Sequence, residues 1–273
     1  MPRFSYGPFT ADLLVDSELT PHFPNCRYVA ERTGAPGSEV SVTRAHGAAS
    51  PVSAGPPETP RSGIPVPGSA GPFATLAPDR SSITIRFPTW TAAVSRSRAD
   101  VRLAEQQGST SDLLDTVLSS VGLAMALLSG GIVLHSSSVV TSSGACVLMG
   151  PSGRGKSTLA RALARSGAII LSDDQTVLSP TGSGFAAQTA VRSNGRSEPV
   201  RGLYFLEQGT QTRRTRLSRK EAFPLLLRQA LLFPSDPALH ELLLDAASRL
   251  VDAVPACRLV VGLSDVSPAC LEE

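Results

Sequence analysis

The sequence has few cysteines, two lysines and almost no net charge, and these shortages exclude several classes of protein. Its four cysteines are scattered, with no CxxC pair and no histidine at metal-ligand spacing, so neither a zinc site nor a disulfide framework is expected. Its 25 lysine and arginine residues are nearly balanced by 23 acidic residues, which argues against a nucleic-acid coat or a polybasic anchor. Aromatic and basic residues are not interleaved. We therefore expect neither nucleic acid nor a membrane among its partners.

The apolar content is high enough for a real core. The chain has 273 residues, of which 41% are hydrophobic, so one large domain, or one domain with an appendage, is expected. The N-terminal residues lack the basic and apolar regions of a secretory signal, which favours a cytoplasmic location. The uncharged run from Thr116 to Leu134 is interpreted as part of a buried amphipathic helix over about 111–128, ended by Gly130 and Gly131; membrane contact is the alternative.

Residues 1–108 are predicted to form a small β-rich region with many loops. Strand-like runs lie at 27–30, 40–44 and 82–87. A Pro/Gly/Ser-rich segment at about 45–78 carries eight prolines and few large apolar side chains. It is predicted to be a flexible insertion, with a rigid polyproline spacer as the alternative. The aromatic side chains of this region are assigned to its core: Phe4, Tyr6, Phe9 and Trp90.

From residue 109 to 273 strands and helices alternate, which predicts an α/β domain. Strands are expected at 132–140, 145–149, 168–171, 176–178, 202–206 and about 257–263, and helices at 157–165, about 218–232 and 236–253. A basic run over 213–220 leads into the second of these helices. We interpret it as a solvated strand-to-helix connection, while docking of an acidic peptide or a phosphate stays open.

The strongest motif is a complete phosphate-binding loop, GPSGRGKS, from Gly150 to Ser157, between a predicted strand and a predicted helix. Backbone N–H groups and the helix N-terminus would bind a polyphosphate there, Lys156 would reach its β- and γ-phosphates, and the Ser157 hydroxyl would ligate Mg²⁺. The predicted nucleotide-binding residues are Gly150, Ser152, Gly153, Arg154, Gly155, Lys156, Ser157 and Thr158.

Two adjacent carboxylates, Asp173 and Asp174, follow the strand after the loop helix, where ligand groups gather in parallel α/β sheets. One would hold the metal and the other would accept the proton of an attacking hydroxyl, although Ser172-Asp173-Asp174 is also good turn chemistry. His135, one strand before the loop, is a further catalytic candidate as a proton relay or charge stabiliser; a hydrogen-bonded core histidine is the alternative.

The succession of Leu134-His135-Ser136-Ser137-Ser138, the loop from Gly144 to Thr158, and Leu171-Ser172-Asp173-Asp174 resembles the nucleotide-binding core of the HPr serine kinase/phosphorylase family. That family is related to the phosphoenolpyruvate carboxykinases. The sequence is similar above all to the short HPr-kinase-like proteins found beside bacterial peptide-modification genes. The resemblance covers about 111–263 and implies a P-loop core of HPr kinase/carboxykinase type that transfers a phosphoryl group from ATP to a serine hydroxyl.

The sequence also departs from that family at two places. Gly167-Ala168 replaces a Gly-His pair, and the acidic segment used for phosphorolysis survives only as an imperfect Glu198-Pro199-Val200-Arg201-Gly202, so phosphorolysis is not expected. The sequence therefore predicts an ATP- and Mg²⁺-dependent kinase whose acceptor is a serine or similar hydroxyl of a peptide or small protein. Two alternatives stay open, a nucleotide-dependent switch with slow hydrolysis and a small-molecule kinase. The acceptor's identity, ATP against GTP, and homo-oligomerisation are not determined.

Overall fold

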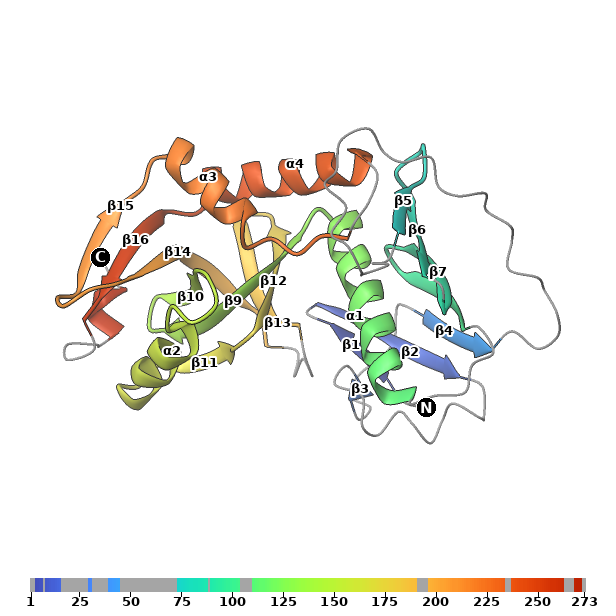
Figure 1. Cartoon of the computed structure of the whole chain (residues 1–273), viewed down its shortest axis with the longest axis horizontal. Coiled ribbons are helices and arrows are strands. Elements are labelled where there is room, and N and C mark those ends of the chain that lie inside the picture. Colours follow the sequence, from blue (N-terminus) through green and yellow to red (C-terminus); the bar gives the residue numbers. More distant parts are fainter. Residues whose placement is uncertain are drawn as a thin grey trace.

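The computed structural model describes residues 3–6, 8–15, 29–30, 39–44, 73–87, 89–103, 110–190, 196–233, 237–262 and 268–271. Within these residues the chain is a mixed α/β structure with two eight-stranded sheets and four α-helices (Figure 1). None of the helices described is both long and apolar enough to cross a membrane.

The first sheet is built entirely from the N-terminal part of the chain. Its strands are β1 (Arg3–Tyr6), β2 (Phe9–Val15), β3 (Val29–Ala30), β4 (Glu39–Arg44), β5 (Phe73–Leu76), β6 (Ser82–Phe87), β7 (Trp90–Ser95) and β8 (Arg98–Leu103). They lie in the order β3-β1-β2-β4-β8-β7-β6-β5. In β7 and β8 buried and more exposed residues alternate, which is the pattern of a sheet with one face on the core and one in solvent.

Helix α1 (Thr110–Leu128) packs against the inner face of this sheet and reaches the second sheet on its other side. All residues from Val121 to Leu128 are buried, so the helix is apolar all round in its last two turns, as expected for a helix enclosed by protein. Gly130 follows with φ 73°, the left-handed conformation that commonly ends a helix. The buried helix predicted from the sequence is confirmed, and so is the burial of Tyr6 and Trp90.

The second sheet carries the rest of the chain. Its strands are β9 (Ile132–Thr141), β10 (Gly144–Met149), β11 (Ile169–Ser172), β12 (Gln175–Thr181), β13 (Gly184–Thr189), β14 (Glu198–Gln208), β15 (Arg213–Arg216) and β16 (Ala256–Val261). Strand β9 is central, because β10 pairs with one of its sides and β11 and β12 pair with the other. Helix α2 (Lys156–Arg165) packs on one face of this sheet, over a cluster that includes Leu148, Leu159 and Leu206.

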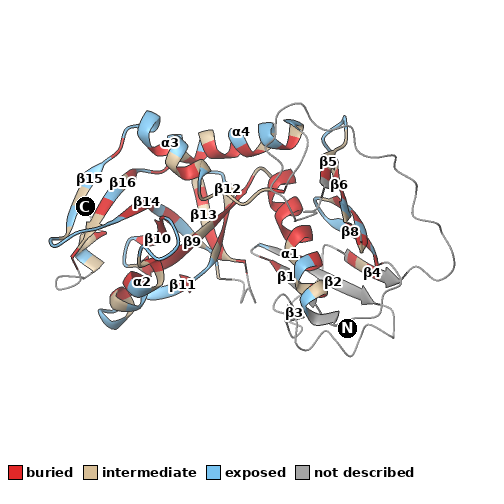
Figure 2. Ribbon diagram, viewed as in Figure 1, coloured by how far each residue is buried: buried red, intermediate tan, exposed pale blue. Residues whose placement is uncertain are grey.

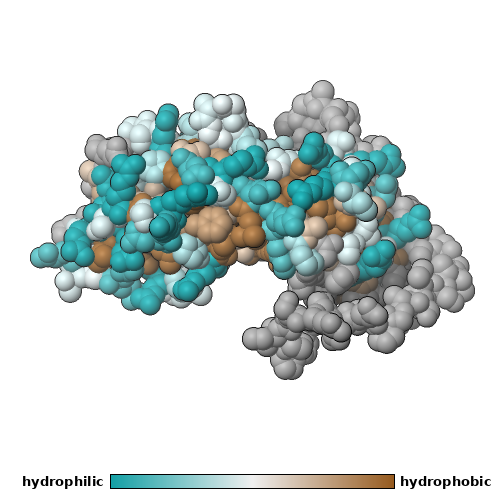
Figure 3. Space-filling model, turned by 90° about the horizontal axis from the view of Figure 1, so that it is seen from above, coloured by the Kyte–Doolittle hydropathy of each residue, from teal (hydrophilic) through white to brown (hydrophobic). Residues whose placement is uncertain are grey.

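Helices α3 (Arg219–Leu227) and α4 (Pro237–Ala253) lie across the top of the molecule in Figure 1, and a short 3-10 helix spans Pro268–Cys270. Hydrophilic side chains are spread over this side, with hydrophobic atoms visible between them (Figure 3). One buried cluster runs without interruption through both sheets, α1 and α4, from Ile85 and Trp90 to Leu134 and Leu250 (Figure 2).

Three sequence predictions are wrong in detail. The segment predicted to be flexible as far as residue 78 ends in strand β5 at 73–76, where four residues pair with β6; residues 45–72 lie outside the described residues. The helix predicted over 218–232 ends at Leu227, because the following residues pair with the edge of β9, with Leu231 N donating to the Val133 carbonyl at 2.8 Å. The basic run begins as strand β15 at the sheet edge and not as a connection.

Other predictions fall partly outside what the structure describes. The strand expected at 27–30 is seen only at 29–30, and the side chains of Phe4 and Phe9 are not described. The boundary between residues 108 and 109 stays a prediction. Strands β1, β2, β7, β8 and β13 were not predicted.

Candidate functional site

The glycine-rich loop and the aspartate pair meet on the two sides of strand β9. Met149, the last residue of β10, pairs with Ser136, and the loop begins directly after it. On the other side Ser172, the last residue of β11, pairs with Ser138, and Asp173 and Asp174 follow. Because β10 and β11 run in the same direction, both ends point to the same edge of the sheet. Two motifs that lie 16 or more positions apart in the chain are thereby brought together.

The loop from Gly150 to Gly155 adopts a conformation that depends on glycine. Gly153 has φ 77° and Gly155 has φ 89°, which L side chains rarely adopt. A Cβ atom at either position would meet no heavy atom within 4 Å, so backbone strain and not crowding selects glycine there. Gly155 caps α2, which places the N-terminal N–H groups of that helix beside an open space. This is the arrangement that binds phosphate groups through the backbone.

Lys156 is the first residue of α2 and its side chain folds back over the loop. Its Nζ donates to the Gly150 carbonyl at 2.7 Å and lies 3.4 Å from the Pro151 carbonyl. Only 8% of the residue is exposed. Burial lowers the pKa of the Lys156 amine, and the negative charge of Asp174 opposes that shift. The ammonium group is thus held by carbonyl oxygens, which an anionic ligand can replace.

Asp174 and His135 form a pair at the open side of the site. The Asp174 Oδ1 atom lies 3.3 Å from His135 Nδ1, and the two side chains are 52% and 42% exposed. The strand register holds this pair, since His135 pairs with Gln175 and the Asp174 carbonyl accepts a hydrogen bond from Ser136 N at 3.0 Å. The structure therefore places His135 beside Asp174, and the charge of Asp174 reaches the Lys156 amine.

Asp173 faces different neighbours. Its Oδ1 atom accepts a hydrogen bond from the Ser137 hydroxyl at 3.1 Å, and its Oδ2 atom lies 3.5 Å from Arg161 Nη2 on α2. The side chain is 42% exposed. The two adjacent carboxylates thus have different environments. Asp174 lies beside His135 and acts on the charge of Lys156, whereas Asp173 lies beside the Ser137 hydroxyl and Arg161. This difference allows them to have different roles.

Beneath the site lies a buried row of hydroxyl groups. The Ser136 hydroxyl donates to Thr176 Oγ1 at 2.9 Å, and Thr176 donates to Ser138 Oγ at 3.2 Å. All three side chains are fully buried. Buried polar groups with satisfied partners fix the relative position of the elements that carry them. The row therefore locks β12 against β9 under the residues that flank Asp174.

A cavity of about 310 Å³ lies against the loop on the side away from the aspartates. It is bounded by the loop, the first turns of α2 and the ends of β14 and β16, through Gly153, Arg154, Thr158, Leu206, Gln208 and Val261. Its walls are partly apolar, and Gln208 Nε2 lies 3.5 Å from the Gly153 carbonyl. The cavity is continuous with the loop, so a group attached to a loop-bound phosphate has room there.

The remaining predicted residues lie around this centre. Ser152, Arg154 and Thr158 are exposed, and Ser157 is half-buried in the first turn of α2. Among the described residues Ser157 makes no hydrogen bond to either aspartate. Sequence reasoning missed Ser137 and Arg161 as partners of Asp173, and it missed the cavity residues Leu206 and Gln208. Ser137 was visible in the serine run after His135, but nothing local marks the others, because their roles follow from strand pairing.

The donor set fits a nucleotide and a magnesium ion. Glycines in the left-handed conformation, a helix N-terminus and a replaceable lysine suit a polyphosphate. The described residues contain no group of three His, Cys, Asp or Glu side chains able to hold a metal alone. Mg²⁺ commonly binds through one or two carboxylates together with phosphate oxygens and water, and Asp173, Asp174 and Ser157 offer that kind of partial site.

Comparison with known proteins finds no matching family model and no matching curated protein. Among solved structures, this chain is similar to the HPr(Ser) kinase/phosphatase from Coxiella burnetii. The two are 16% identical, and the similarity covers 42% of this chain and 87% of that chain with a TM-score of 0.23. A TM-score this low says nothing about function, which must be argued from the site geometry and the motifs.

Proposed function

We propose that this chain is an ATP- and Mg²⁺-dependent phosphotransferase whose acceptor is a serine or similar hydroxyl of a peptide or small protein. The observation that carries the proposal is the gathering of Lys156, Asp174 and His135 beside a glycine-rich loop at a helix N-terminus. The motif resemblance to HPr serine kinases supports the same chemistry. Phosphoryl transfer needs positioning and charge stabilisation more than covalent participation of the protein, and this site offers both.

Each residue has a distinct role in this proposal. The backbone N–H groups of residues 153–157 and the Lys156 amine hold the phosphates. ATP, when bound, supplies the γ-phosphoryl group, and Mg²⁺ offsets the charge of the phosphates. Asp174 accepts the proton of the acceptor hydroxyl, and His135 holds that carboxylate at Oδ1. Asp173, oriented by its hydrogen bond from Ser137, and Ser157 would bind the Mg²⁺ ion.

The exposure of the site favours a peptide over a small enclosed molecule. Asp173 and Asp174 are 42% and 52% exposed, so the base is open to solvent. An extended chain can bring a hydroxyl to such a surface from outside. A small-molecule kinase would instead enclose its substrate so that water is excluded.

Intact-mass analysis of candidate acceptor peptides, incubated with the full chain, ATP and Mg²⁺, tests this proposal. The wild type should add one phosphoryl group. Lys156→Ala and Asp174→Asn should each lower turnover by about a hundredfold or more, whatever the Mg²⁺ concentration. Asp173→Asn should instead raise the Mg²⁺ concentration needed for half-maximal rate. Lys220→Ala, which removes the other lysine, exposed on α3, is the matched control and should leave turnover unchanged.

Two outcomes would contradict the proposal. ADP formation at the same slow rate with and without every acceptor, and no phosphorylated product, would favour a nucleotide-dependent switch. Equal loss on Lys220→Ala and Lys156→Ala would show that the effect comes from charge alone and not from the loop lysine.

A further inference from the structure

A second cavity lies far from the loop, on the outer face of the first sheet. It has a volume of about 570 Å³ and is lined by side chains of β4, β6, β7 and β8, among them Ser41, Thr84, Arg86, Thr91, Asp100 and Arg102. The neighbouring residues Ile85, Ala92 and Val101 point into the core, so the polar members face outward. We call this cavity the outer-sheet pocket.

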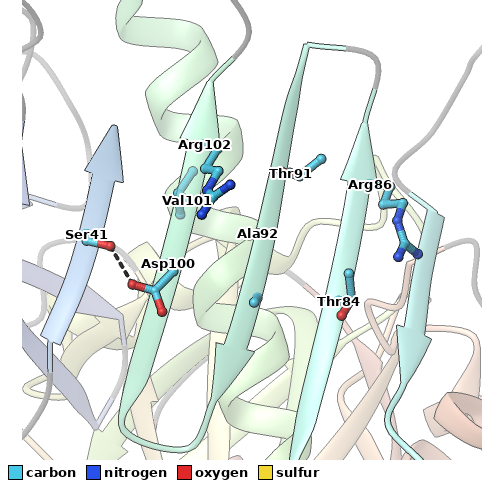
Figure 4. A pocket seen from close by; sticks show the side chains of 9 residues that line it. Ser41, Thr84, Arg86, Thr91, Ala92, Asp100, Val101 and Arg102 are labelled. Carbon is cyan, nitrogen blue, oxygen red and sulfur yellow. Dashed lines mark hydrogen bonds between the residues drawn. The ribbon is translucent and has the colours of Figure 1, made fainter. Parts of the chain in front are cut away.

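The strand register arranges its polar side chains in rows across the sheet. Arg86 on β6 pairs with Thr91 on β7, and Thr91 pairs with Arg102 on β8. Figure 4 shows the two arginines on either side of Thr91. Since adjacent strands are about 4.8 Å apart, the two arginine backbones are roughly 10 Å apart with one hydroxyl between them. Below this row lie Thr84 and Ala93, whose small side chains form a shallow floor.

The charges of this face do not cancel. The Asp100 carboxylate is bound by other groups: it accepts hydrogen bonds from Arg98 at 3.0 and 3.1 Å and from the Ser41 hydroxyl at 2.7 Å. These hydrogen bonds, from Arg98 first and then Ser41, lower the pKa of the Asp100 carboxyl, and the charges of Arg98 and Arg102 act in the same direction without a hydrogen bond from Arg102. Arg86 and Arg102 are exposed, and neither donates a hydrogen bond to another described residue. The pocket therefore presents two guanidinium groups without a hydrogen-bonded carboxylate among the described residues.

We infer that the outer-sheet pocket binds an acidic segment of an extended peptide. Two carboxylates of the peptide pair with Arg86 and Arg102, and its backbone crosses Thr91 above the floor formed by Thr84 and Ala93. In an extended chain of polyproline II type, with three residues per turn, residues three positions apart project from the same side and are separated by about 9 Å, which matches the spacing of the two arginines. Arginine binds carboxylates through parallel N–H···O bonds, so the pocket selects for charge and spacing together. The described residues that line the pocket include no aromatic side chain that could stack on a nucleic-acid base.

This inference does not depend on the proposed kinase activity, because the pocket needs no nucleotide. The binding test uses the full chain without ATP and follows the fluorescence anisotropy of a labelled peptide that carries two glutamates three positions apart. A second probe carries glutamine at both positions. The glutamate peptide should bind, and its affinity should fall with added salt, whereas the glutamine peptide should not bind.

Substitutions locate the binding on the sheet face. Arg86→Gln and Arg102→Gln should each weaken binding about tenfold, since each removes one charge-assisted contact. Ala93→Leu should block the floor without a change of charge and weaken binding similarly. Arg165→Gln removes an exposed arginine from the last turn of α2, on the other sheet and outside the basic run over 213–220, and should leave the affinity unchanged. Because these side chains are all exposed, circular dichroism should show an intact fold.

The inference is overturned by any of three results. The glutamine peptide binds as tightly as the glutamate peptide, or the Arg86 and Arg102 variants bind like the wild type, or a single-stranded oligonucleotide displaces the glutamate peptide at equal concentration. The last result would indicate a general polyanion surface in place of a peptide site.

Discussion

Lys156 carries its charge in a place that is largely closed to water. Burial lowers the pKa of its amine below the usual 10.5, while Asp174 acts in the opposite direction. The lysine therefore loses its proton at a lower pH than a lysine in solvent. A polyphosphate needs the charged amine, so ligand binding and the protonation of Lys156 are linked.

This linkage predicts the pH dependence of nucleotide binding. As pH rises through the lowered pKa, the affinity for an ATP analogue should decrease while an unperturbed lysine would still be charged. Asp174→Asn removes the opposing charge, so the loss should begin at lower pH, and Lys156→Arg should abolish the alkaline loss. Fluorescence titrations with the ATP analogue from neutral to alkaline pH measure this loss of affinity. Over the same window the empty protein should become more stable with pH, because the unfolded state binds the additional proton. An alkaline loss that persists in Lys156→Arg would contradict the assignment.

The sequence singled out these candidate residues but not their arrangement. The motif placed Lys156, and the paired aspartates and His135 were found from their positions after or within predicted strands. The different neighbours of Asp173 and Asp174 could not be predicted. It depends on the irregular register between Ile170 and Ser172, which sets where the two side chains point. Arg161 became a partner of Asp173 only when α2 packed beside β11.

Helix α1 and the first sheet lie in very close contact. Gly122 lies in the middle of the helix, and a Cβ atom there would be 2.1 Å from Tyr6 Cγ on β1. The ring of Tyr6 is buried and its Cγ atom cannot move without the strand. Gly122 thus allows the contact between α1 and β1 at the cost of a weaker helix.

Gly122→Ala should therefore destabilise the protein by about 1–3 kcal/mol, although alanine is the better helix former by about 1 kcal/mol. In the background of Tyr6→Ala the same substitution should be neutral or stabilising, because the methyl group then has space. Urea unfolding of the four proteins in this double-mutant cycle measures the coupling. Additive effects of the two substitutions would show that the helix and strand do not meet at Gly122.

Elements whose apolar residues recur at a regular spacing could be predicted from the sequence, whereas strands defined only by pairing with a neighbouring strand could not. The apolar spacing of α1 and the apolar runs of β9 and β10 carry their own signal. Strand β15, with the sequence RRTR, has no apolar side chain and is a strand because it pairs with β16 at the sheet edge, where charged residues are common. Strand β5 was hidden by the proline-rich sequence before it. The helix predicted to continue past Leu227 stops because β9 offers hydrogen bonds to residues 229 and 231.

On the scale of the whole molecule, the two sheets share one hydrophobic core. Helix α1 packs on both, and α4 reaches from the second sheet to β5 of the first. An ion pair at 2.7 Å between Arg80 and Glu241 on α4 also links them, but its side chains are 52% and 60% exposed. Exposed pairs contribute at most about 1 kcal/mol, so the shared core is the main connection.

Unfolding should accordingly be a single cooperative event. Trp90, the one tryptophan in the sequence, is buried in the first sheet and reports on it by fluorescence, whereas far-ultraviolet circular dichroism reports on both sheets. The two signals should change at the same urea concentration, and Glu241→Gln should shift the midpoint only slightly. Separate transitions would show that the N-terminal sheet folds as an independent unit.

The scarcity of lysine has a consequence for covalent labelling. The side chains of Lys156 and Lys220 are the two ε-amines in the sequence, one 8% exposed and hydrogen-bonded inside the loop, the other exposed on α3. An acylating reagent therefore meets one accessible and one protected lysine in the folded chain. Acylation of Lys220 records contact with the reagent, and acylation of Lys156 records the moments when the loop releases its amine. The chain thus contains an internal reference and a reporter of loop opening without any engineered residue.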